Sequence, residues 1–177
     1  MQTFIPLAHS YAASVAVLDY QRLGKQRVET MQLVTAITGL AFPTDKEVAG
    51  GKVEGRIFNR GQHRGWQHHP AAVMWSDNVL ALLAYQEATC DEWEARGYLD
   101  TCREKTRALV LDHQRREAGW GRIVPVALHP SWWGDDRIHA SHRANLVRKL
   151  PERYLLLWPN TQPINGYIWP SPKGTTS

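Results

Sequence analysis

The stretch that decides the fold is HHPAAVMWSDNVLALLAYQEATCDEWEARGY, residues 68–98. Pro70 suits the first turn of a helix, and Gly97 suits the position just after a helix ends. Between them, apolar side chains recur at helical spacing; they are Val73, Met74, Leu80, Leu83, Ala84, Ala88 and Trp93. We therefore predict one long amphipathic helix from about Pro70 to Arg96.

Three further segments have helical character. Apolar residues at helical spacing predict a helix over 15–39, bent at Gly24 and ended by Gly39. A strongly charged helix is expected at about 100–116, and another at 137–149, stopped by Pro151. The fold class is therefore mainly α.

The remaining sequence predicts long loops around a single helical domain. Residues 42–66 are rich in glycine and charge, which predicts an inserted surface loop. Turn residues and aromatic anchors fill the C-terminal part, and 171–177 are expected to form a flexible tail. We expect one domain over residues 1–170.

Composition is typical of a globular protein without a membrane span or a disulfide framework. The chain has 177 residues, 43% hydrophobic and 21% charged, which is ordinary globular chemistry and enough for one core. The first residues lack a signal peptide, and no apolar run approaches the length of a membrane span. Cys90 and Cys102 form no CxxC pair, so neither a zinc site nor a disulfide framework is indicated. We expect a cytoplasmic monomer without membrane contact, metal or cofactor.

Charge is distributed unevenly along the chain. The formal net charge is +4, with acidic residues concentrated in 87–104 and basic residues in 137–153. A molecule that is basic on one side would be steered towards DNA or RNA. Two solvated helix faces would produce the same pattern.

The segment LDYQRLGKQRVE, residues 18–29, is the first candidate site. On a helix, its acids, bases and amide lie along roughly one side; they are Asp19, Arg22, Lys25, Gln26 and Glu29. A carboxylate in such a set can stabilise a developing positive charge, and the cations can hold phosphates. An amphipathic helix with Asp19–Arg22 and Lys25–Glu29 ion pairs is the structural alternative.

Two histidine-containing segments are the other candidates. His69 lies at the N-terminal edge of the helix predicted from Pro70, where it could contact a phosphate, transfer a proton or cap the helix. Residues 138–154 contain His139 and His142 with several basic residues. Because this HxxH pair has no identifiable third ligand, a phosphate-binding helix explains it better than a metal site does.

Together these motifs give a specific resemblance. The order of LDYQRLGKQRVE, HHPAAVMWSDNVLALLAYQEATCDEWEARGY and SHRANLVRKLPERYLLLW resembles the pyrimidine-dimer DNA glycosylase family, whose familiar member is the phage endonuclease V. The closer similarity is to a divergent bacterial and phage subgroup that carries RLGKQRVE, HPA..MW and SHR..L..K. The resemblance covers most of the chain, apart from the 42–66 loop and the tail, and implies an endonuclease-V-like fold.

The resemblance also implies a chemistry. In the family, the amine of the processed N-terminus forms an imine with C1′, a glutamate in the first helix assists, and strand cleavage follows by elimination. The target nucleotide is flipped out of double-stranded DNA. This chain departs at two positions: alignment through Tyr20 puts Arg22 at the family's glutamate, and Gln2 replaces a small residue, although Met is usually retained before a bulky one.

We therefore expect a DNA-binding enzyme that acts on damaged or modified pyrimidine bases as an N-glycosylase, with AP-lyase activity left open. A non-catalytic nucleic-acid-binding protein and a different base-modifying enzyme are the alternatives. The partner is double-stranded DNA with a flipped base. Asp19 is predicted to stabilise charge, Lys25 to be the amine and Glu29 to orient it.

The expected site residues fall into two sets. The catalytic set is Asp19, Arg22, Lys25, Glu29 and His69. The nucleic-acid-binding set is Arg22, Lys25, Gln26, Arg27, His139, His142, Arg143, Arg148 and Lys149. Binding should weaken linearly with log salt, and Arg143→Ala should reduce that slope.

Overall fold

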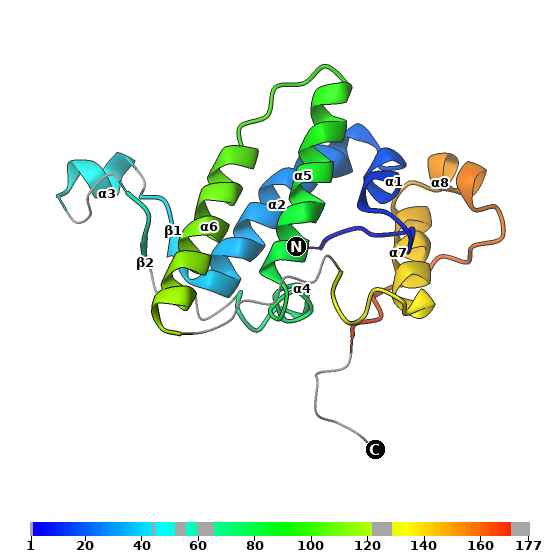
Figure 1. The fold of residues 1–177 in the computed structure, drawn as a ribbon. Helices are drawn as coiled ribbons and strands as arrows, with labels where there is room; N and C mark the ends of the chain where they lie inside the picture. Colours follow the sequence, from blue (N-terminus) through cyan, green and yellow to red (C-terminus); the bar gives the residue numbers. More distant parts are fainter. Residues whose placement is uncertain (1, 44, 52–55, 60–65, 122–128, 171–177) are drawn as a thin grey trace.

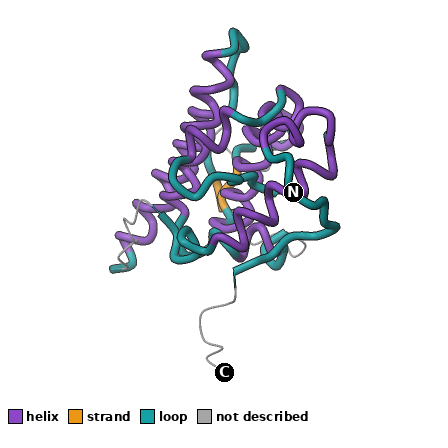
Figure 2. Tube along the Cα trace, turned by 90° about the vertical axis from the view of Figure 1, so that its right-hand side faces the viewer, coloured by secondary structure: helices purple, strands orange, loops and turns teal. Residues whose placement is uncertain are grey.

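The computed structural model describes residues 2–43, 45–51, 56–59, 66–121 and 129–170. These residues are mainly helical, which confirms the predicted fold class (Figures 1 and 2). The helices are α1 Tyr11–Ala16, α2 Tyr20–Thr38, α3 Asp45–Ala49, α4 Pro70–Val73, α5 Val79–Ala95, α6 Arg103–Gly119, α7 Asp136–Lys149 and α8 Pro151–Leu157. Strands β1 (Leu40–Ala41) and β2 (Phe58–Asn59) pair antiparallel. The predicted tail at 171–177 lies outside the described residues.

Two predicted helices are each divided in two. The helix predicted from Pro70 to Arg96 breaks between α4 and α5, where the Asn78 side chain accepts the Ala81 N–H at 2.9 Å. The helix predicted over 15–39 breaks between α1 and α2, where Asp19 caps α2. Short polar side chains satisfy the free N–H groups of a new first turn, so they start helices that periodicity alone would run together.

Two other boundaries also differ from the prediction. Pro151 opens α8 directly after α7, because its fixed φ and missing N–H suit a first helical turn. Within the predicted 42–66 loop, the described residues include α3 and β2, and the rest lies outside the described residues. Gly39 ends α2 as expected, with the left-handed φ of 71° that a glycine adopts without strain.

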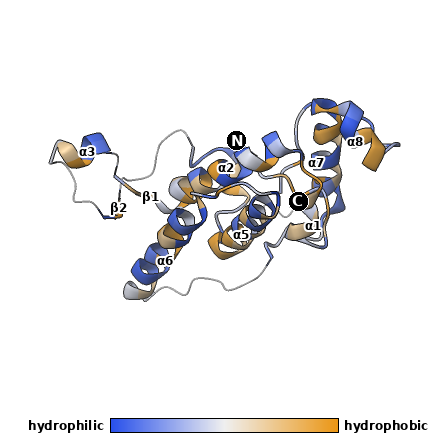
Figure 3. Cartoon of the chain, turned by 90° about the horizontal axis from the view of Figure 1, so that it is seen from above, coloured by the Kyte–Doolittle hydropathy of each residue, from blue (hydrophilic) through white to orange (hydrophobic). Residues whose placement is uncertain are grey.

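The helices form two groups joined by the N-terminal segment. Helix α5 packs against α1, α2 and α6, while α7 packs against α8. Residues 2–6 are buried between the two groups (Figure 1). The core includes fully buried Trp75, Tyr85 and Tyr154. Helices α5 and α6 carry hydrophobic and hydrophilic residues side by side, as expected for helices with one buried face (Figure 3).

Among the described residues, no helix has both the length and the apolar character that a bilayer span requires.

Gly24 allows α2 to approach Trp93 closely. A Cβ at this position would lie 3.1 Å from two ring carbons of Trp93. That ring stacks on Tyr98 with centroids 4.2 Å apart and donates from Nε1 to the Leu99 carbonyl at 3.0 Å, so it is held in place.

Gly24→Ala is therefore expected to destabilise the protein. Alanine would add about 1 kcal/mol of helix propensity, but overpacking against a fixed ring costs about 1–3 kcal/mol. We expect a net loss of about 1 kcal/mol in the free energy of unfolding, measured by urea denaturation. A more stable variant would show that Trp93 can move aside.

Candidate active site

The N-terminal segment is held on α2 by hydrogen bonds from its backbone. The nitrogen of Gln2 donates to Glu29 Oε2 at 3.0 Å, and the Gln2 carbonyl accepts from Gln26 Nε2 at 2.9 Å. The Phe4 N–H and the Tyr85 hydroxyl both donate to Gln26 Oε1, at 3.0 and 2.7 Å. Because Gln26 is buried and fully engaged, it sets the register of the segment and brings the residue-2 nitrogen to Glu29.

A cavity of about 310 Å³ opens beside this contact. Its lining comes from the N-terminal segment, α2, the end of α7 and the C-terminal segment, and consists of Gln2, Phe4, Gln21, Arg22, Lys25, Gln26, Glu29, Lys149 and Tyr167. Three of these side chains are basic and one, Glu29, is a carboxylate. The cavity therefore combines an anion-attracting wall with a carboxylate that contacts the residue-2 nitrogen.

The pKa of Lys149 shows how the charges around this cavity act on one another. Partial burial lowers the pKa of its amine, and the positive charges of Arg148, Arg22 and Lys25 lower it further. At Lys149 the repulsion from these cations outweighs the attraction from Glu29. A bound phosphate would relieve that repulsion, which is the arrangement expected at a nucleic-acid backbone site.

Tyr167 also lines the cavity, and α7 holds the loop segment that carries it. Ser141 Oγ accepts the Ile168 N–H at 3.1 Å, and the Asn145 side chain donates to the Gly166 carbonyl. The Tyr167 ring meets Phe4 edge-on, with centroids 6.2 Å apart. Burial raises the pKa of Tyr167 to about 12, so its hydroxyl stays protonated at neutral pH.

Asp19 is placed as a structural residue. Its Oδ1 accepts the N–H groups of Gln21 and Arg22 at the start of α2, and its Oδ2 pairs with the Arg22 guanidinium at 2.5 Å. The Tyr154 hydroxyl also donates to Oδ2, at 2.8 Å. Burial alone would raise the pKa of Asp19, but these donors outweigh it and lower the pKa. The carboxylate is thus fully engaged and does not line the cavity.

Several residues expected to contact DNA are buried instead. His139 and His142 are fully buried and contact the N-terminal segment, so neither ring is exposed at the surface of the folded protein. Arg27 is 7% exposed and pairs with Asp100 at 2.7 Å. Arg143 is half-buried and donates to the Pro6 carbonyl at 2.6 Å.

His69 caps α4. Its Nδ1 accepts the Ala71 N–H at 3.1 Å, and its ring contacts those of Trp66 and Trp169. Partial burial lowers the pKa of the imidazole. The residue is half-buried and lies outside the set that lines the cavity, so its cap role is the one the structure displays.

The structure thus brings together Arg22, Lys25, Gln26, Glu29 and Lys149 from the expected sets. Gln2, Phe4, Gln21 and Tyr167 complete the cavity and were not expected as site residues. No local pattern distinguishes Phe4 and Tyr167 from core aromatics, because only long-range packing brings both to α2. For Gln2, its position at the family's N-terminal residue was the available signal.

Comparison with known proteins identifies the family. The model of the pyrimidine dimer DNA glycosylase family matches residues 1–106, which is more than half of the chain. The protein therefore belongs to this family, as the motifs in 18–29 and 68–98 indicated. No curated protein and no solved structure matches the chain. The matched region includes α2 and Glu29, whereas α7 and Tyr167 lie beyond it.

Proposed function

We propose that the protein is a DNA N-glycosylase that removes damaged or modified pyrimidines from double-stranded DNA. The observation that carries this proposal is the 3.0 Å hydrogen bond between the residue-2 nitrogen and Glu29 Oε2 at a basic cavity. Membership in a family of pyrimidine dimer DNA glycosylases supports it. In this proposal the protein acts as a monomer, in the cytoplasm.

In this proposal Glu29 replaces Asp19 as the charge-stabilising carboxylate. As the bond between C1′ and the base nitrogen breaks, the electron pair leaves with the base and positive charge develops on the sugar. A preorganised carboxylate beside C1′ stabilises that charge. Lys25 and Lys149 would hold the flanking phosphates while the nucleotide is flipped into the cavity, and Arg22, already paired with Asp19, would add positive charge to its wall.

We propose as the attacking amine the α-amine of residue 2, which requires that residue 1 be removed even though Met is usually retained before a bulky residue such as Gln2. Its lone pair attacks C1′, the base departs with the bonding pair and takes up a proton, and ring opening gives an imine. Glu29 would accept a hydrogen bond from this amine and hold it in place. An α-amine suits the step because its ordinary pKa of about 8 leaves part of it neutral at pH 7. Lys25, exposed at the cavity, is the second candidate amine.

Borohydride trapping tests the proposal directly. Purified protein would be incubated with duplexes that contain a pyrimidine dimer, a hydroxymethylated or glycosylated pyrimidine, or an abasic site, and base release would be measured. Peptide mapping of the reduced adduct would assign the amine, and the intact mass would report whether residue 1 is present. We expect an adduct on residue 2. An adduct on Lys25 would reassign the amine, and intact DNA across the whole panel would overturn the glycosylase proposal.

Lys149 provides the test of phosphate binding. Lys149→Ala should reduce the slope of log affinity against log salt by about 1, because one fewer counterion is released. Arg143→Ala should change the slope less, since that guanidinium already donates to Pro6. Lys105→Ala, at an exposed position on α6, is the matched control and should leave the slope unchanged. Equal slopes for Lys149→Ala and wild type would remove Lys149 from the phosphate site.

A further inference from the structure

Gln2 is anchored at both its backbone and its side chain. The backbone binds α2 through Glu29 and Gln26. The side-chain amide turns away from them: Nε2 donates to the Thr3 carbonyl at 2.9 Å and lies 2.7 Å from Nε2 of His142. Gln2 is only 5% exposed, so it joins α2 to α7 inside the protein. The position of the residue-2 nitrogen therefore depends on both helices.

His142 is well suited to hold that amide. It is fully buried; with the proton on Nδ1, that nitrogen donates to the Ile5 carbonyl at 3.3 Å while Nε2 accepts from the Gln2 amide, so the ring is fixed against the same segment at two points. Burial, followed by the charge of His139, lowers the pKa of His142 to about 3, so the ring is neutral. A neutral imidazole has one donor and one acceptor nitrogen, and because Gln2 Nε2 can only donate, His142 Nε2 is the acceptor and Nδ1 carries the proton.

We infer that His142 is a positioning residue for the base-release step, acting through the Gln2 side chain to hold the residue-2 nitrogen on Glu29. This role rests on the proposed function. It assigns a catalytic purpose to α7, which lies outside the region matched by the family model. It also explains why a long amide side chain occupies position 2, since a small residue there could not reach α7.

The contact between Gln2 and His142 matters because the residue-2 nitrogen and Glu29 come from separate elements of the fold. Gln2 and Glu29 are 27 residues apart, and Gln2 and His142 are 140 apart. If the Gln2–His142 contact is lost, His139 and Arg143 still hold Ile5 and Pro6, but residue 2 keeps only its backbone bonds to α2 and its nitrogen can shift relative to Glu29. A displacement of about 1 Å at a reacting group can slow a reaction about 100-fold.

His142→Phe tests the inference, because it keeps a ring of similar size and removes both nitrogens. We expect the single-turnover rate of base release to fall about 100-fold, with DNA affinity within threefold of wild type. The matched control is His139→Phe. His139 is equally buried one turn earlier, but its nitrogens contact the carbonyls of Ile5 and Trp133 instead of Gln2. Both variants would be assayed below the temperature at which either unfolds.

A double-mutant cycle separates positioning from general loss of structure. Gln2→Met keeps the length of the side chain and removes the amide. If the pair acts as one unit, adding His142→Phe to Gln2→Met should slow base release little further. Fully additive rate losses, or equal losses in His139→Phe and His142→Phe, would overturn the inference.

Nitrogen NMR of the histidine rings distinguishes the possible failures. Gln2→Met should shift the ring nitrogens of His142 and leave those of His139 unchanged. An unchanged His142 spectrum would show that the contact is absent, whatever the activity. If Gln2→Met shifts the His142 resonances but the wild-type protein releases no base, the proposed function is overturned, and the positioning role with it.

Discussion

Glu29→Gln is expected to reduce base release about 100- to 1000-fold, the usual effect of removing a preorganised group that stabilises transition-state charge. The amide has nearly the same shape, and its oxygen can still accept a hydrogen bond from the residue-2 nitrogen. Its negative charge, however, is gone. Since Glu29 makes no ion pair shorter than 4 Å with the cations described in the structure, folding should change little. Single-turnover kinetics on the substrate identified by the panel would measure the effect.

Asp19→Asn is the matched control on the same helix. It makes the same carboxylate-to-amide change at the start of α2, where the side chain caps the helix and pairs with Arg22. We expect it to lower the free energy of unfolding while base release by the folded protein stays within a few-fold of wild type. If Asp19→Asn abolishes base release and Glu29→Gln does not, the two roles are reversed.

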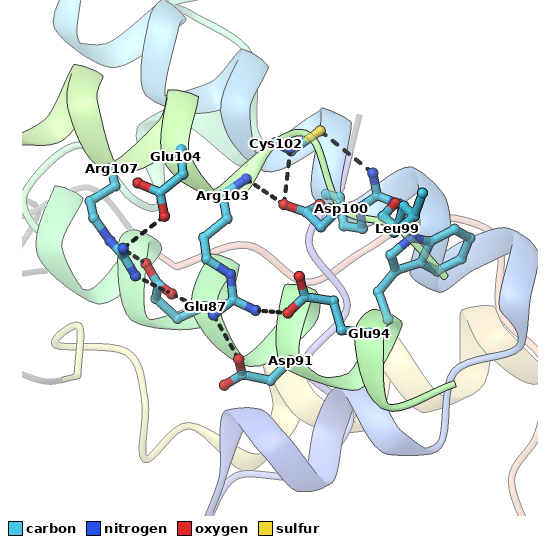
Figure 4. Close-up of polar contacts among 11 residues, drawn as sticks. Glu87, Asp91, Glu94, Leu99, Asp100, Cys102, Arg103, Glu104 and Arg107 are labelled. Atoms are coloured by element: carbon cyan, nitrogen blue, oxygen red, sulfur yellow. Dashed lines mark hydrogen bonds and ion pairs between the residues drawn. The ribbon is translucent and has the colours of Figure 1, made fainter. Parts of the chain in front are cut away.

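Asp100→Ala is expected to have the largest effect on stability, about 3–5 kcal/mol, because it leaves a buried arginine without its partner. Asp100 Oδ1 accepts from Arg27 Nε at 2.7 Å, and the two side chains are 3% and 9% exposed. Its Oδ2 accepts the N–H groups of Cys102 and Arg103 where α6 begins (Figure 4). The Arg27 guanidinium also lies over the Trp93 ring, 4.5 Å from its centroid. One carboxylate therefore ties α2 to the start of α6.

Asp91→Ala provides the control for Asp100→Ala in the same network. Asp91 pairs with Arg103 at 2.7 Å, but its side chain is 67% exposed, so water solvates the charges when the pair is lost (Figure 4). We expect a change of less than about 1 kcal/mol in the free energy of unfolding. Guanidinium denaturation of both variants measures the difference. Similar losses would mean that the Arg27–Asp100 pair is solvated in the folded protein.

Acidic pH should weaken the contact between Arg27 and Asp100. Burial alone would raise the pKa of Asp100, but the Arg103 N–H and the Arg27 guanidinium outweigh it and lower the pKa below its ordinary value of 3.8. A carboxyl group whose pKa is lower in the folded state contributes stability above its unfolded pKa and loses it as the pH falls through the folded pKa. Wild type should therefore lose stability below about pH 4 more steeply than Asp100→Ala does. Parallel acid curves would contradict this assignment.

Local sequence determined where the main helices lie and which polar side chains share one side of α2. The spacing of apolar residues locates α2 and α5, because a helix repeats every 3.6 residues whatever it packs against. Helix α6 was expected as a strongly charged segment and α7 as a segment that ends before Pro151. The same spacing puts Lys25 and Glu29 on one side of α2, and both line the cavity. The two helix breaks were missed because a capping side chain acts on a single turn and is hidden within a longer apolar pattern.

Only the tertiary structure decided which carboxylate faces the cavity and which histidines are buried in the protein. Asp19 and Glu29 are chemically alike on one helix, but Tyr154 from α8 engages Asp19, whereas the residue-2 nitrogen meets Glu29. Likewise, His142 resembles a surface contact beside basic neighbours until the N-terminal segment covers it. Helical periodicity specifies which residues share a face. The identity of the partner depends on contacts across 27 to 140 residues, and these form only when the two helix groups close around that segment.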